Sequence, residues 1–176
     1  MTGRGPRKGI VWHLVRLGAF ASCLLIVSFA WAEDEAILSI GGAAERPLAL
    51  TAKELRAMPA VTATVTEHNG EKSRYEGVSI VSLLESAGLT FGTALRGKRL
   101  ATYLLVQARD GYQAVFALPE LDPAFNDRVI FLAYAKNGSE LPEAEAPLRV
   151  IVLNEKREAR WVRQVTGLKI LLVPSQ

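Results

Sequence analysis

The residue types that favour ligand binding most clearly lie near the C-terminal end, in KREARWVRQV, residues 156–165. In this segment Arg160 and Arg163 flank Trp161. An indole ring stacks well on a flat heterocycle, and guanidinium groups donate paired hydrogen bonds to anionic or carbonyl groups. If the segment is extended, Trp161 and Arg163 share one face and Arg160 lies on the other. The alternative is structural: Trp161 fills the core and the arginine stems cover apolar surface.

A second candidate is VQARDGYQAVFAL, residues 106–118, with Asp110 and Gly111 at its centre. Asp-Gly between two apolar runs predicts a β-hairpin, because both residues tolerate the positive φ of a type I′ turn. These residues alone predict a turn, and the rest of the chain must indicate whether the turn also borders a binding site.

Other residue types give little support for acid–base or metal chemistry. His68 has no candidate partners nearby in the sequence, so we expect a solvated loop residue. The acids at 33–35, together with Glu140, Glu143 and Glu145, are also expected to be solvated. Neither group forms the enclosed carboxylate pair that acid–base catalysis uses. Glycine-rich nucleotide-binding motifs and the G-x-S-x-G motif of hydrolases are absent from the sequence.

The first 32 residues have the pattern of a secretory signal peptide. A basic start without acids precedes the apolar run LGAFASCLLIVSFA, residues 17–30, and small residues surround Trp31. The sequence therefore predicts a cleaved signal, residues 1–32, and a periplasmic domain, residues 33–176. The alternatives are an uncleaved anchor, for which the apolar run is short, and a lipoprotein modified at Cys23.

Removal of this segment changes the charge balance. The chain has 21 Lys and Arg residues and 18 Asp and Glu residues, and four of the cations precede residue 17. Residues 33–176 thus carry 17 cations against 18 anions, a net charge of −1, which argues against a nucleic-acid partner. Cys23 is the only cysteine, so the predicted mature chain has no thiol for a disulfide, a metal or a nucleophile. Its length suits one domain.

Apolar periodicity predicts the elements that position these residues. Helices are expected at 52–57, after a capping box that starts at Thr51, and at 79–87, before Gly88. The predicted strands are 36–40, 61–66, 72–76, 100–108, 112–118, 128–135 and 148–154, with one or two more near the end. Many short strands with few helices indicate an α+β fold built as a single mixed-sheet domain.

Five segments in sequence order resemble a known family. They are LTAKELRAMP, YEGVSIVSLLESAG, VQARDGYQAVFALPEL, APLRVIV and REARWVRQVTGLKI. Together they resemble the oxidoreductase molybdopterin-binding domain, the sulfite oxidase fold, and especially its small secreted members, from about residue 36 to the end. The resemblance implies that the domain encloses a pterin-type ligand. It also implies ligand-binding roles for Asp110, Tyr112, Arg149, Arg160, Trp161 and Arg163.

The chain departs from the catalytic members of this family at one place. Those members hold molybdenum through a cysteine in the strand after the first helix, and here its place falls near Thr66 or Glu67. Neither residue is a soft thiolate ligand, so molybdenum and catalysis are not expected. The resemblance implies instead a non-catalytic periplasmic pterin-binding protein that relays to a membrane-anchored signalling partner. The alternatives are a molybdenum-cofactor-dependent oxidoreductase, a subunit of one, or a scaffold for protein contacts.

Overall fold

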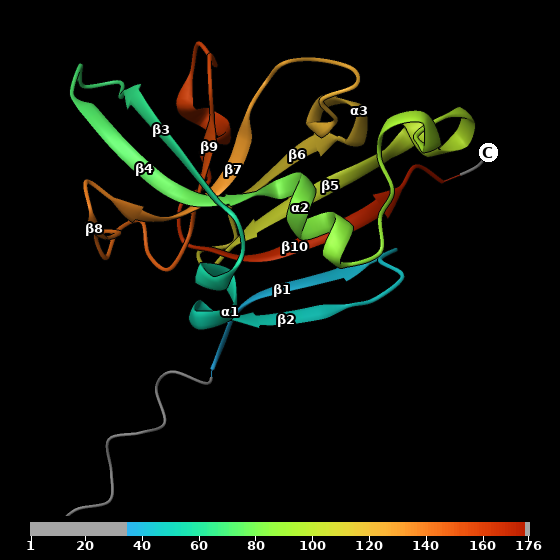
Figure 1. The fold of residues 1–176 in the computed structure, drawn as a ribbon, viewed down its shortest axis with the longest axis horizontal. Coiled ribbons are helices and arrows are strands. Elements are labelled where there is room, and N and C mark those ends of the chain that lie inside the picture. The colour runs from blue at the N-terminus through green and yellow to red at the C-terminus, as the bar shows by residue number, and fades with distance from the viewer. Residues whose placement is uncertain (1–34, 175–176) are drawn as a thin grey trace, which may run out of the picture. The chain divides into compact units, whose positions relative to one another are not determined.

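Two sheets of five strands each form the framework of residues 35–174, the part of the chain that the computed structural model describes (Figure 1). The predicted signal peptide, residues 1–32, lies outside the described residues. The first sheet has the order β2-β1-β10-β5-β6. The second has the order β3-β4-β7-β8, with β9 paired to the same strand β7.

The first sheet brings the two ends of the domain together. β1 and β10 run parallel, and the other neighbours are antiparallel. Apolar residues alternate along these strands, so that one face of the sheet packs into the core. The strands are β1 (Ala36–Gly42), β2 (Leu48–Thr51), β5 (Thr102–Ala108), β6 (Gln113–Ala117) and β10 (Val165–Leu172).

The second sheet is antiparallel throughout and carries the most deeply buried strand. All four residues of β9 are buried, as its nearly continuous apolar sequence predicts. β4 lies between β3 and β7, which makes β3 an edge strand. The strands are β3 (Ala60–Thr66), β4 (Lys72–Ser79), β7 (Ile130–Lys136), β8 (Ser139–Glu140) and β9 (Arg149–Val152).

Short helices connect the strands, and the first two were predicted. The Thr51 hydroxyl accepts from the Glu54 N–H at 3.2 Å and the Glu54 carboxylate accepts from the Thr51 N–H at 2.8 Å, which is the predicted capping box. The second helix ends before Gly88, whose φ of +95° is costly for other residues. The helices are α1 (Ala52–Ala57), α2 (Ile80–Ser86), α3 (Leu118–Leu121), and the 3₁₀ turns η1 (Gly92–Ala94), η2 (Gly97–Ala101) and η3 (Glu158–Arg160).

The predicted α+β fold is confirmed, and four local details of the prediction need correction. The hairpin at Asp110-Gly111 is present, but positive φ occurs at Gly111 alone, so the turn is not type I′. The short strand β2 was not predicted. The segment 137–147, whose acids were predicted to be solvated and which was not expected to contain a strand, begins with the hairpin to β8. Finally, η3 replaces the extended backbone considered for residues 156–165.

Candidate functional site

Arg149 is the centre of a buried polar network at the start of β9. Its side chain is inaccessible to solvent, and its Nη1 donates to the Tyr75 hydroxyl at 2.6 Å. The same nitrogen lies 2.9 Å from Glu145 Oε2, and Nη2 lies 3.3 Å from Glu158 Oε2. A charge in an otherwise apolar strand is tolerated here because two carboxylates and a hydroxyl surround it.

A second cation, Lys136 on β7, completes the network. Its Nζ lies 2.8 Å from Glu67 Oε1 and 3.7 Å from Glu145 Oε1. Tyr75, which is opposite Lys136 in the β4–β7 ladder, also donates to Glu67 Oε1 at 3.0 Å. We call these six residues the Arg149 network: Glu67, Tyr75, Lys136, Glu145, Arg149 and Glu158. Three carboxylates face two cations, so the network carries one net negative charge when all five are ionised.

Contacts and burial within the network shift the pKa values of Glu67, Tyr75 and Lys136. Burial alone would raise the pKa of Glu67, but hydrogen bonds from Lys136, Ser73 and Tyr75 outweigh it and lower that pKa to about 2. Burial raises the pKa of Tyr75 to about 12. Burial opposes the charge of Lys136, but its contact with Glu67 raises its pKa overall. A base with a pKa near 2 is poorly suited to proton transfer near neutral pH, so the network resembles a structural ion cluster.

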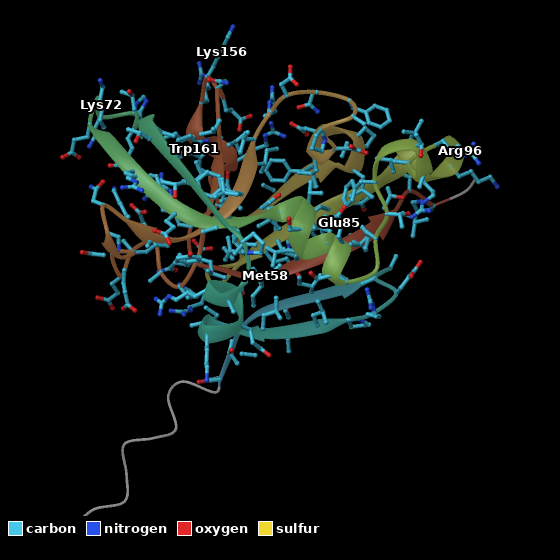
Figure 2. All side chains as sticks on the ribbon, in the orientation of Figure 1. Met58, Lys72, Glu85, Arg96, Lys156 and Trp161 are labelled. Atoms are coloured by element: carbon cyan, nitrogen blue, oxygen red, sulfur yellow. The ribbon has the colours of Figure 1, made fainter. Side chains whose placement is uncertain are left out.

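Trp161 packs in the core against this network and is only 6% exposed (Figure 2). The Arg149 guanidinium carbon lies 5.4 Å from the centre of its ring, within the range of a cation–π contact. Trp161 Nε1 and Arg149 Nε are both buried, and neither has an acceptor among the described residues. These two unpaired donors are the feature of the site that most directly favours a ligand with acceptor atoms.

Arg160 points to a different cluster. Its two Nη atoms donate to the Glu120 carboxylate at 3.1 and 2.8 Å, and Nε donates to Glu155 at 2.9 Å. The guanidinium also lies 4.6 Å from the centre of the Phe116 ring. The hydrogen bond with Glu120 is the main cause that raises the pKa of Arg160. The Arg160 guanidinium is therefore already paired with carboxylates of the chain. Its two hydrogen bonds to Glu120 have the paired geometry that the sequence predicted for a ligand.

The Asp110 turn reaches η3 through Tyr112. Asp110 Oδ1 accepts from the Tyr112 N–H at 2.9 Å and thereby holds the turn. The Tyr112 hydroxyl donates to the Ala159 carbonyl at 2.7 Å, while half of the tyrosine remains exposed. Arg163 is exposed as well.

The six predicted residues therefore gather around η3 but not on one open face. Arg149 and Trp161 are buried, Arg160 is held by acids, and the other three lie at the surface. The alternation considered for an extended segment is wrong, because Trp161 and Val162 are both buried. The hydrogen bond from the Trp161 N–H to the Glu158 carbonyl closes η3 and rotates both side chains inward. The structural alternative for Trp161, core packing, is what the geometry favours.

Sequence reasoning missed five members of the Arg149 network: Glu67, Tyr75, Lys136, Glu145 and Glu158. Glu145 was predicted to be solvated, but it is only 8% exposed, and Arg149 and Lys136 compensate its charge. One signal was present, since an arginine in the apolar run LRVIVLN requires buried acidic partners. His68 is exposed, as predicted, and its backbone N–H donates to Glu158 at 2.6 Å.

Two surface hollows lie outside the predicted site. One, of about 490 Å³, is lined by Glu120, Asn126, Asp127, Arg128, Leu153 and Asn154. The other, of about 460 Å³, is lined by Arg56, Glu76, Tyr134, Ala135, Gly138, Ser139 and Glu140. Within residues 35–174, no cluster of His, Cys, Asp or Glu is arranged to hold a metal ion. No helix in this part of the chain is long and apolar enough to cross a membrane.

Comparisons with known proteins agree with the fold. The family model of the oxidoreductase molybdopterin binding domain matches residues 28–176. Among solved structures, the chain is similar to the crystal structure of the sulfane dehydrogenase SoxCD from Paracoccus pantotrophus, with a TM-score of 0.61 and 21% identity. The match covers 82% of this chain and 39% of the other, so this chain spans well under half of that protein's length. A comparison with curated proteins gave no match.

Proposed function

Because the chain belongs to the oxidoreductase molybdopterin-binding domain family, we propose that it binds a pterin-type ligand beside η3 and supplies no ligand to molybdenum. The observation that carries this proposal is the position of Glu67. Glu67 is one of the two residues, with Thr66, near which the resemblance places the molybdenum-binding cysteine, and Lys136 and Tyr75 hold its carboxylate.

The residues beside η3 fit the pterin part of the cofactor. Arg149 Nε and Trp161 Nε1 are buried donors without acceptors, and the ring nitrogens and carbonyl groups of a pterin are acceptors. Arg163 and Tyr112 supply a guanidinium and a phenol at the surface of the same region. These residues would recognise a bound pterin and hold it in one orientation.

The same residues do not fit a molybdenum centre held by protein sulfur. No cysteine occurs in residues 35–174, and the oxygen atoms of Glu67 lie against Lys136, Tyr75 and Arg149. A carboxylate is a hard ligand, whereas the cysteine of the catalytic relatives is a soft one. We therefore derive no redox step for this chain.

A binding protein without its own chemistry requires a partner to report binding. We propose, as the signal-like N-terminal sequence suggests, that the domain acts in the periplasm and contacts a membrane-anchored signalling protein.

The comparisons favour a second candidate more than this first one. The matched family is an oxidoreductase domain, and the similar structure is that of a dehydrogenase. In this candidate the chain is a molybdenum-cofactor-dependent oxidoreductase or a subunit of one, and the missing metal ligand comes from another chain or from the cofactor. The lack of a thiolate ligand in residues 35–174 favours the pterin-binding protein, whereas the matched family favours the oxidoreductase.

The metal and pterin content of the purified protein separates the two candidates. The chain is produced with its N-terminal segment in a host that synthesises the molybdenum cofactor, and is recovered from the periplasm. We expect pterin fluorescence in the extracted small molecules, with far less than one molybdenum per chain by elemental analysis. About one molybdenum per chain would instead support the oxidoreductase.

Variants at the surface of the site test where the pterin binds. Arg163→Ala should weaken pterin binding at least tenfold, about 1.4 kcal/mol, without lowering the melting temperature. The matched control is Arg96→Ala, an exposed arginine elsewhere on the domain (Figure 2). Equal binding by both variants would place the ligand away from Arg163.

A further inference from the structure

The edge strand β3 has the features of a pairing surface, and these are independent of the proposed ligand. β3 and β4 form a hairpin at the upper left of Figure 1, and β4 is the strand to which β3 is paired. Seven residues of β3, Ala60–Thr66, face β4 without a bulge. Among the described residues, no other backbone group is hydrogen-bonded to this strand.

This edge lacks the devices that usually prevent strands from pairing between molecules. Exposed edges are commonly protected by charged residues, proline, bulges or short length. The sequence AVTATVT contains no charge and no proline, and five of its seven residues are β-branched threonine or valine on alternating faces. Thr62, Thr64 and Thr66 are exposed, and Val61, Ala63 and Val65 are half-buried against the core.

We propose that β3 pairs with β3 of a second copy of this chain, antiparallel and with Ala63 facing Ala63 across a two-fold axis. The sequence Val61-Thr62-Ala63-Thr64-Val65 is the same when read in either direction. In this register each valine faces a valine and each threonine faces a threonine of the other copy, and such pairs stabilise sheets. The half-buried apolar stripe then continues across the axis, and the two five-stranded sheets become one.

Charge favours this register over its neighbours only weakly, because the charged groups lie further apart than the Debye length at physiological ionic strength. On β4, Glu76 is opposite Thr62 and Arg74 is opposite Thr64. With Ala63 on the axis, each row of the joined sheet ends in Glu76 of one copy and Arg74 of the other, about 14 Å apart across three strand spacings. A centre at Thr62 would instead put Glu76 at both ends of a row, and a centre at Thr64 would put Arg74 at both ends. The proposed register is therefore the one that avoids like charges.

The oligomeric state of charged variants tests the surface. We expect the purified chain to show a monomer–dimer equilibrium by sedimentation equilibrium. Thr62→Lys with Thr64→Lys puts like charges opposite each other in both symmetric pairs, whereas Thr62→Lys with Thr64→Glu puts opposite charges there. The dissociation constant of the dimer should be at least tenfold higher for the Lys–Lys variant than for the Lys–Glu variant. Circular dichroism checks that both variants remain folded.

The matched control is Val115→Lys on β6, the exposed edge strand of the other sheet, which should leave the dimer unchanged. Three outcomes overturn the proposal. They are a parent that stays monomeric at all accessible concentrations, a dimer that the two lysines do not weaken, and a dimer that Val115→Lys disrupts. These measurements are made without added pterin, so their failure leaves the proposed ligand binding to its own test.

A disulfide tests the register. In a Cys23→Ser background, Ala63→Cys should form a cross-linked dimer on mild oxidation, because directly opposite residues have Cα atoms within disulfide range. Val61→Cys should not, since the two copies of residue 61 are about 14 Å apart along the strands. Cross-linking through residue 61 and not residue 63 would refute the two-fold centre at Ala63.

Discussion

The Glu67 carboxylate offers the sharpest test of the Arg149 network. Its pKa falls from an ordinary value of 4.5 to about 2 in the folded chain. The unfolded chain therefore binds more protons than the folded chain between these values, and stability rises with pH across that range. The contribution is complete above about pH 5 and is lost as the pH falls through about 2.

The size of this contribution follows from the shift. A difference of about 2.5 pKa units corresponds to about 3 kcal/mol of unfolding free energy at pH 7. At pH 3 the same linkage leaves about half of this contribution. Glu67→Gln removes the charge but keeps the shape of the side chain, so the variant should lose about 3 kcal/mol at pH 7 and about half of that at pH 3.

Urea unfolding followed by tryptophan fluorescence at several pH values between 3 and 7 measures this difference. The control is Glu85→Gln, an exposed acid on α2 for which the described residues show no ion pair. This control should stay within about 0.5 kcal/mol of the parent at every pH. A loss for Glu67→Gln that is below 1 kcal/mol at pH 7, or that does not change with pH, would refute the ionised, paired state of Glu67.

Two further predictions concern the neighbours of Glu67, and both use urea unfolding followed by circular dichroism, because Trp161 is the only tryptophan in residues 33–176. Arg149→Ala should cost about 3–5 kcal/mol, because it leaves Glu145 and Glu158 without their buried cation; a cost near that of an exposed site would contradict the network. Trp161→Ala should cost about 3–5 kcal/mol as a core truncation. Arg163→Ala, two residues away and exposed, should change stability by less than about 0.5 kcal/mol, and equal effects of these two substitutions would contradict the observed burial.

Local sequence signals were sufficient for most of the fold. The capping box at Thr51 and the helical spacing before Gly88 act within a few residues, and both helices form as predicted. The predicted hairpin at Asp110-Gly111 also pairs β5 with β6. Turn type was predicted less well, because the dipeptide permits positive φ at Asp110 and does not require it.

The site was harder to predict because several of its contacts are long-range, such as those of Tyr75 with Arg149 and of Glu67 with Lys136. Glu145 belongs to a polar segment that predicts solvent exposure, and only the position of Arg149 on β9 makes its burial favourable. Trp161 illustrates the same limit. The neighbouring strands favoured extended backbone, but a single 3₁₀ turn places Trp161 in the core and leaves Arg163 at the surface. Side-chain alternation applies only where the backbone is a strand.

Burial of the Arg149 network restricts how a ligand can reach its unpaired donors. Arg149 Nε and Trp161 Nε1 are buried, so an acceptor reaches them only if a neighbouring group moves. Glu158 lies on η3 at the surface side of the network, and it is held by two contacts, Arg149 Nη2 at 3.3 Å and the His68 N–H at 2.6 Å. A ligand that moves Glu158 away from both of these partners would also release the turn between β3 and β4. Because β3 is the strand that we propose to pair between copies, Glu158 connects the candidate ligand site to the candidate dimer edge.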